Sequence, residues 1–292
     1  MAVSLACVGV ATGLTTTAKA SFPGSNGSIA FTGQGNGVAG PCANSSCIKF
    51  ISPAGGVERT LNVIAGVNNA QYSPNGKVLV FDHHTPSACC QIYTVHANGT
   101  HVLRITHGAD DEDPAWSPDG QHIVFSRQPK SGEVELYVVD AGGTHLHALT
   151  HGAAGGRAPD WSTKGLIAFQ GHGGSGNDIF VMAADGTGET DVTNGSPGGC
   201  SAPSWSPDGQ WIVFIAGTNV WRMRSDGTEK KRLTRTASFK DHPVFSPSGT
   251  RIVYQDFVTG SSQLWVMRTD GSRRRQLTHD GSANGAPTWQ PR

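Results

Sequence analysis

The chain carries little charge and has no long apolar segment. Lysine and arginine number 22, aspartate and glutamate number 22, and charged residues make up 15% of the 292 residues. Because the charges balance, no overall field favours a polyanion, and we expect no nucleic acid among the partners. No apolar run reaches about eighteen residues, so we expect that the mature protein does not span a membrane.

Motifs of two common functional classes are also missing. The sequence has no Gly-x-Ser-x-Gly nucleophile elbow and no Cys-x-x-Cys zinc pair. No spacing links a serine, a histidine and an aspartate into a triad. We therefore predict no catalytic residues and no metal ligands, and an enzyme is the less favoured interpretation.

The N-terminus is typical of an export signal, although no Lys or Arg precedes its apolar run. Val3 to Leu14 is apolar, and Ala18-Lys19-Ala20 offers a cleavage site. The alternative is a disordered or strand-forming tail. We expect residues 1–20 to be a signal peptide that is cleaved near Ala20, and the mature protein to be periplasmic or secreted.

Cysteine is scarce, with six residues in the chain. Cleavage near Ala20 would remove Cys7 and leave Cys42, Cys47, Cys89, Cys90 and Cys200. Cys42 and Cys47 flank a short loop and could close a small disulfide. The adjacent pair Cys89-Cys90 has no partner assigned by spacing, and an odd number leaves one thiol over. We expect structural roles for all five.

Glycine, at 39 residues, and proline, at 16, are abundant, as in proteins built of short strands and tight turns. An aromatic residue recurs at steps of 44, 45, 44, 40 and 44 residues, and in five copies Ser and a turn ending in Gly follow it. The six aromatic residues are Tyr72, Trp116, Trp161, Trp205, Phe245 and Trp289. A period in the low forties with four strand-like segments per copy predicts a propeller blade.

The best-formed copy illustrates the four segments. Pro118, Asp119 and Gly120 suit a type I turn that ends with positive φ at the glycine. Two β-branched and aromatic strands follow, at 123–125 and 136–139, and Gly142-Gly143 marks a hairpin. The fourth strand of each copy is expected to end in Leu-Thr or a close variant.

The two ends of the chain belong to one copy. The chain opens on a second-type strand at 27–31 and closes on a first-type strand that holds Trp289. We predict that Trp289 pairs beside Ile29 and closes the ring. The predicted fold is an all-β, six-bladed β-propeller with four antiparallel strands per blade, over residues 21–292.

These repeats resemble the TolB-type, WD-like propeller repeat of exported bacterial proteins. The resemblance rests on the aromatic-Ser-Pro-Asp-Gly turn, the Ile-Val-Phe strand, the aliphatic-aromatic-Val-Met strand, Asp-Gly and Leu-Thr. It covers about residues 21 to 292. It implies a cell-envelope propeller that docks a protein partner. The N-terminal α/β domain of TolB has no counterpart before Ile29, so a role in the Tol system does not carry over.

In a propeller, the segments that enter the innermost strands surround the mouth of the central channel. We therefore select Asn69, Glu112, Asp113, Arg157, Asp241 and His242 as candidate binding residues. Asp113 and His242 belong to blades three apart, so we expect them on opposite sides of the ring. The densest acidic run, Asp110 to Asp113, has three interpretations: a solvated loop, a Ca²⁺ site in or near the channel, or a site for a basic peptide.

Histidines and basic residues suggest further sites. Convergence of His84, His172 and His242 on a metal would suit a zinc site, but no spacing supports it. The basic runs 230–232 and 273–275 fall on outermost strands, where charge blocks edge-to-edge pairing.

The sequence therefore predicts an exported, monomeric interaction module at the cell envelope, with no cofactor, that binds a protein, peptide or glycan at the channel mouth. The alternative is a metal-assisted polysaccharide lyase or hydrolase with its site at the same mouth. Some TolB-like propellers are lyases with a histidine-bound metal, and here only His242 clearly occupies a channel-facing position.

Overall fold

A computed structural model of the chain describes residues 22–34, 45–62, 64–85, 88–107, 110–152, 154–174, 176–195, 198–258 and 260–292. The predicted signal peptide and its cleavage point lie outside these residues, as do the side chains of Cys42 and Cys89. Cys47 is disulfide-bonded, whereas Cys90 and Cys200 are not. In the described part of the chain, no helix has the length and apolar character needed to cross a bilayer.

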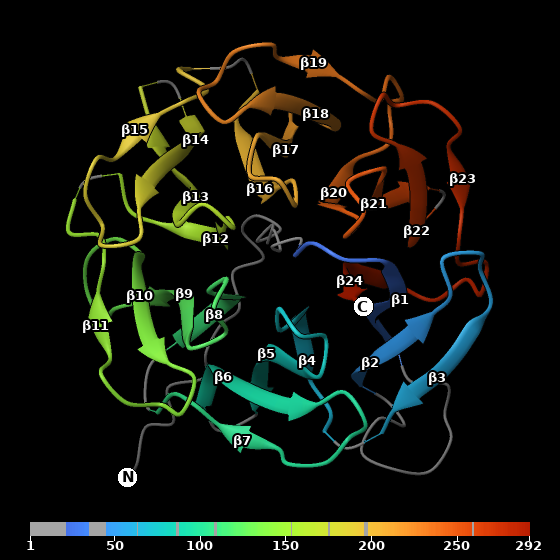
Figure 1. Ribbon diagram of the computed structural model, residues 1–292, viewed down its shortest axis with the longest axis horizontal. Helices are drawn as coiled ribbons and strands as arrows, with labels where there is room; N and C mark the ends of the chain where they lie inside the picture. Colours follow the sequence, from blue (N-terminus) through green and yellow to red (C-terminus); the bar gives the residue numbers. More distant parts are fainter. Residues whose placement is uncertain are drawn as a thin grey trace, which may run out of the picture.

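Six four-stranded antiparallel sheets stand in a ring, which confirms the predicted six-bladed propeller (Figure 1). The innermost strands are β4 (Val67–Tyr72), β8 (Asp110–Trp116), β12 (Arg157–Trp161), β16 (Cys200–Trp205), β20 (Lys240–Phe245) and β24 (Asn284–Pro291). The second strands are β1 (Asn26–Gln34), β5 (Val78–Thr85), β9 (His122–Gln128), β13 (Leu166–Gly173), β17 (Trp211–Ala216) and β21 (Arg251–Val258).

The third strands are β2 (Ser46–Ile51), β6 (Ala88–His96), β10 (Glu135–Asp140), β14 (Gly176–Ala183), β18 (Asn219–Arg224) and β22 (Ser261–Arg268). The outermost strands are β3 (Val57–Leu61), β7 (Leu103–Arg104), β11 (His147–Ala148), β15 (Thr190–Asp191), β19 (Lys231–Arg232) and β23 (Arg275–Gln276).

The ring closes as predicted. Strand β24 pairs with β1, and Trp289 lies directly opposite Ile29 in the register. The first and last strands of the described chain therefore lie in one blade, with β24 innermost and β1 beside it (Figure 1).

The core lies between the blades. Six buried clusters each combine residues from two neighbouring blades, one cluster for each seam of the ring. Trp289, for example, packs with Ile29 of its own blade and with Val253 and Leu264 of the preceding blade. Every blade therefore depends on its neighbours for the burial of its aromatic residues.

The Leu-Thr signature follows the outermost strand instead of ending it, which corrects the sequence prediction. Strands β7, β11, β15, β19 and β23 are two residues long and stop just before the signature. The threonine hydroxyl then accepts a hydrogen bond of 2.8–3.0 Å from a backbone N–H of the third strand. A side chain thus replaces the missing strand partner, because a buried N–H must be satisfied.

The glycine of the aromatic-Ser turn has the predicted positive φ, between 62° and 75°, in all five copies. In the best-formed copy, Ser117 donates to the Asp119 carboxylate and accepts from the N–H of His122. The Ser-Pro-Asp-Gly motif is therefore a turn with its own internal hydrogen bonds, and this explains why it recurs.

Candidate functional site

The six candidate residues lie on four of the innermost strands, β4, β8, β12 and β20. Each innermost strand has a break in its pairing register at one equivalent position, with φ between 47° and 60°. The residues at that position are Asn69, Asp113, Ala158, Ala202, His242 and Ala286. Such β-bulges redirect side chains and are frequent beside functional sites. Asp113 on β8 and His242 on β20 lie in opposite blades, as predicted (Figure 1).

The preceding blade holds several of these bulges in place. The backbone N–H of Asp113 donates to Asp82 Oδ1 at 3.3 Å, and that of Ala158 donates to Ser126 Oγ at 3.1 Å. Asp82 and Ser126 both follow the aromatic residue of a second strand. In the blade that precedes His242, Ile215 occupies this position, and its side chain cannot accept a hydrogen bond. The N–H of His242 therefore donates to the carboxylate of Asp241 at 2.8 Å. The bulges at Asp113 and Ala158 are therefore tied to the preceding blade, whereas the bulge at His242 is held within its own strand.

Four carboxylates gather where β4, β5 and β8 meet, and we call them the acidic cluster: Asp82, Asp110, Glu112 and Asp113. Asp82 and Asp113 are buried, and the amide of Asn69 donates to both, at 2.8 Å and 3.0 Å. Glu112 and Asp110 are half-buried. One amide thus bridges two carboxylates from neighbouring blades.

The acidic run belongs to strand β8, so its interpretation as a solvated loop is wrong. Alternate residues of a strand point to opposite sides. Asp111 is fully buried, and both of its carboxylate oxygens accept from the guanidinium of Arg127, at 2.6 Å and 2.8 Å. Asp111 is therefore neutralised within its own blade.

Two members of the acidic cluster, Glu112 and Asp113, have raised pKa values. Burial, followed by the neighbouring charges of Asp82 and Asp110, raises the pKa of Glu112 to about 7. Burial, followed by the charges of Glu112 and Asp82, raises the pKa of Asp113 well above its ordinary value. Arg157 on β12 opposes both shifts with its positive charge. A further positive charge close to these groups would lower both pKa values.

This shift predicts how stability changes with pH. Between the ordinary Glu112 pKa of 4.5 and its value of about 7, the folded protein holds a proton that the unfolded chain has released, so stability falls as pH rises. We expect the melting temperature of the wild type to fall between about pH 5 and pH 7.5. In Glu112→Gln, we expect the fall over the same range to be smaller by about 2 °C or more.

Differential scanning fluorimetry across this range measures the effect. Glu229→Gln is the matched control, because Glu229 pairs with Arg224 on an exposed outer turn. Parallel pH profiles for the wild type and Glu112→Gln would contradict the prediction.

The predicted residues divide between two cavities and the acidic cluster. A cavity of about 240 Å³ is lined by Asn68, Asn69, His242, Gln255 and Gly285, among others. Arg157 instead lines a separate cavity of about 180 Å³ with Glu133, Gln170 and His172. Asn69 joins the first cavity to the acidic cluster, and Asp241 supports His242, with 3.3 Å between its Oδ2 and His242 Nδ1. Glu112 and Asp113 belong to the cluster itself.

The three histidines considered for a metal site lie against different partners. His84 Nδ1 is 3.8 Å from Cys90 Sγ, His172 Nε2 is 3.8 Å from Glu133, and His242 is held by Asp241. Within the described residues, the three do not form a metal-binding group. The interpretation as a histidine-metal lyase therefore gains no support from their positions.

Sequence reasoning missed Asp82 and Cys90. Asp82 follows the aromatic residue of a second strand, the position that holds Ser126 and Gln255 in other blades, and this equivalence was visible in the repeat. Cys90 lies on β6, twenty residues before its hydrogen-bond partner Asp110, and no motif marks it.

Comparisons with known proteins agree with the fold. The family model of the TolB beta propeller domain matches residues 111–292. The chain is 37% identical over 84 residues to an uncharacterized protein of Agrobacterium fabrum, covering 27% of this chain and 28% of that protein. It is 34% identical over 76 residues to the Tol-Pal system protein TolB of Geobacter sulfurreducens, covering 25% of this chain and 17% of that protein.

Among solved structures, TolB from Acinetobacter baumannii superposes with a TM-score of 0.78 at 19% identity, over 91% of this chain and 67% of that one. This similarity shows a shared fold. The chain matches less than a third of the length of either curated relative.

Proposed function

Because the chain belongs to the TolB beta propeller family, we propose that it is an exported interaction module of the cell envelope whose channel mouth binds a cationic peptide segment of a partner protein. The observation that carries this proposal is the acidic cluster, which Asn69 joins to a cavity of about 240 Å³. Similarity to a Tol-Pal system protein supports a role in protein interaction.

The charge around the mouth is uneven, and this favours a cationic ligand. Three of the six bulge positions, Ala158, Ala202 and Ala286, present only methyl groups. The carboxylates gather on the β4–β8 side instead. Charges of one sign within a low-dielectric cleft focus the field and attract an opposite charge. A lysine, an arginine or a terminal amine has the right charge to pair with Glu112 and Asp110.

The cavity beside the cluster provides the remaining contacts. Asn68, Asn69, Gln255 and His242 offer amide and imidazole groups along its wall. Such groups satisfy the backbone N–H and C=O of an extended peptide. A cationic side chain next to the cluster, with its backbone across this wall, fits both features.

Export is part of the same proposal. Cys47 is disulfide-bonded, and disulfides persist in oxidising compartments. This supports the periplasmic or secreted location predicted from the N-terminal signal, with the mature propeller acting as a monomer.

Binding of a short lysine- and arginine-containing peptide, measured by fluorescence anisotropy, tests the proposal. We expect Glu112→Gln to weaken binding at least about tenfold, since a hydrogen bond to a charged group contributes about 1.5–3 kcal/mol. Added salt should weaken binding to the wild type more than to the variant.

Two controls define the result. Glu229→Gln removes an exposed carboxylate from an outer turn and should leave binding unchanged. A peptide of the same length with glutamate in place of the basic residues should not bind. Equal affinity of the wild type and Glu112→Gln for the basic peptide would remove the acidic cluster from the binding site.

A further inference from the structure

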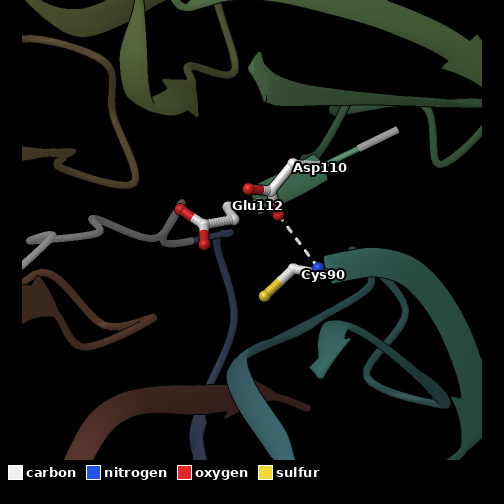
Figure 2. A group of neighbouring side chains, drawn as sticks. All are labelled: Cys90, Asp110 and Glu112. Carbon is white, nitrogen blue, oxygen red and sulfur yellow. Dashed lines mark hydrogen bonds between the residues drawn. The ribbon is translucent and has the colours of Figure 1, made fainter. Parts of the chain in front are cut away.

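Cys90, Asp110 and Glu112 face a common space between two blades (Figure 2). Cys90 lies on β6, and the two carboxylates lie on β8 of the next blade. One ligand atom from each residue lies within 4.8 Å of the other two. The N–H of Cys90 donates to Asp110 Oδ1 at 2.9 Å and holds the two strands together at this point.

The three side chains are of the types that bind zinc. Zn²⁺ binds thiolate sulfur, imidazole nitrogen and carboxylate oxygen in a tetrahedron, at about 2.0–2.3 Å. Ca²⁺ and Mg²⁺ select oxygen ligands, so a thiol among the donors argues against them. A nitrogen donor is also near, because Nδ1 of the exposed His84 lies 3.8 Å from Cys90 Sγ.

The three donor residues form hydrogen bonds with one another. Asp82 and Asp113 are bridged by the amide of Asn69, whereas the carboxylate of Glu112 has the Cys90 thiol as its hydrogen-bond partner. The Cys90 side chain is 7% exposed, so its sulfur is held among these groups instead of in solvent. The negative charges of Asp82 and Asp110 lie beside Glu112, and the positive charge of Arg157 opposes them.

We propose that Cys90, Asp110 and Glu112 bind a zinc-class divalent cation. The fourth coordination position of the metal would lie next to His84. Binding replaces the S–H bond of Cys90 with a sulfur–metal bond, and the thiol proton passes to solvent. The donor atoms lie within 4.8 Å of one another and must approach the closer spacing of a tetrahedron on binding. The inference does not depend on peptide binding, although both use Glu112.

Titration of the purified chain with Co²⁺, with Zn²⁺ as competitor, tests the proposal. Co²⁺ bound to a thiolate has a charge-transfer band that carboxylate or histidine binding alone does not produce. We expect one Co²⁺ per chain with this band, displaced by Zn²⁺. The experiment omits reductant so that the disulfide of Cys47 stays intact.

The variants decide which thiol is involved. Cys90→Ala should abolish the band, and Cys90→Ser, which keeps the size of the side chain, should abolish it too. Cys200→Ala is the matched control, since Cys200 is also a buried cysteine that forms no disulfide. The charge-transfer band of this variant should equal that of the wild type. Glu112→Gln should weaken Co²⁺ binding at least about tenfold while keeping the band. Near-ultraviolet circular dichroism confirms that each variant is folded.

Other outcomes overturn the proposal. A wild-type chain that binds no Co²⁺ at micromolar concentration, or binds it without the band, contains no such site. A band that survives in folded Cys90→Ser assigns the thiolate to another cysteine. A metal site that is present while peptide affinity is unaffected by Glu112→Gln would reject the peptide proposal and keep this one.

Discussion

A chain that ends after Ala283, before strand β24, is expected to lose its cooperative unfolding transition. Strand β24 is the innermost strand of the first blade, and it pairs with β1 along Asn26 to Gly33. Its removal would expose that edge and the seam in which Trp289 is 3% exposed. The loss of one buried tryptophan alone costs about 3–5 kcal/mol. Together with the lost backbone pairing, this approaches the whole stability of a domain, about 5–15 kcal/mol.

Urea denaturation followed by tryptophan fluorescence, with size-exclusion chromatography, measures this effect. Trp289→Ala keeps the backbone pairing of β24 and should lower the free energy of unfolding by about 3–5 kcal/mol while the transition stays cooperative. Trp221→Ala is the milder comparison, because Trp221 is half-buried on a third strand. A truncated chain that melts cooperatively within a few degrees of the full chain would show that the ring does not need this closure.

Lys240→Met is expected to destabilise the protein by about 3–5 kcal/mol, because it leaves a buried carboxylate unpaired. Lys240 is 0% exposed on β20, and Asp256 opposite it on β21 is 6% exposed. The ammonium lies 3.4 Å from Asp256 Oδ1 and donates to the hydroxyl of Ser238 at 2.8 Å. Burial lowers the pKa of Lys240, while the charge of Asp256 opposes that shift.

The double variant Lys240→Met with Asp256→Leu separates loss of the pair from loss of packing. Removal of both charges should recover most of the stability, since apolar replacements of buried ion pairs are often neutral. Glu229→Gln breaks the exposed pair with Arg224, 3.1 Å apart, and should cost less than about 1 kcal/mol. Urea denaturation measures all three variants. A single variant as stable as the wild type would mean that Asp256 has another partner or is protonated.

The fold could be predicted because its signals are local and repeated. Gly120 and its equivalents have positive φ in every copy. The opening strand has no first strand before it in the sequence, and the segment that holds Trp289 takes that place. The positions of the mouth residues followed from the same repeat. The sequence overestimates the length of the two-residue outer strands, because Leu-Thr resembles the end of a strand. The threonine hydroxyl in fact takes the place of a backbone acceptor on the outer strand.

The site could be predicted only in part, because its contacts cross from one blade to the next. Asn69 bridges Asp82 and Asp113, which lie 13 and 44 residues further along the chain. Asp111 and Glu112 are neighbours in sequence, yet one pairs with Arg127 and the other faces Cys90. A run of four acidic residues gives no indication of which members are neutralised, since strand alternation and the seam decide this.

The shortness of the outermost strands has a consequence for how the molecule tolerates change. Five of the six have two residues, so the circumference rests on threonine hydroxyls and on long side chains that reach the neighbouring blade, such as Lys230 to the carbonyl of Thr193. Few backbone bonds constrain this perimeter, and local opening there costs little. We therefore expect substitutions on the circumference to cost less stability than substitutions at the hub, where the bulges at Asp113 and Ala158 are tied to the preceding blade.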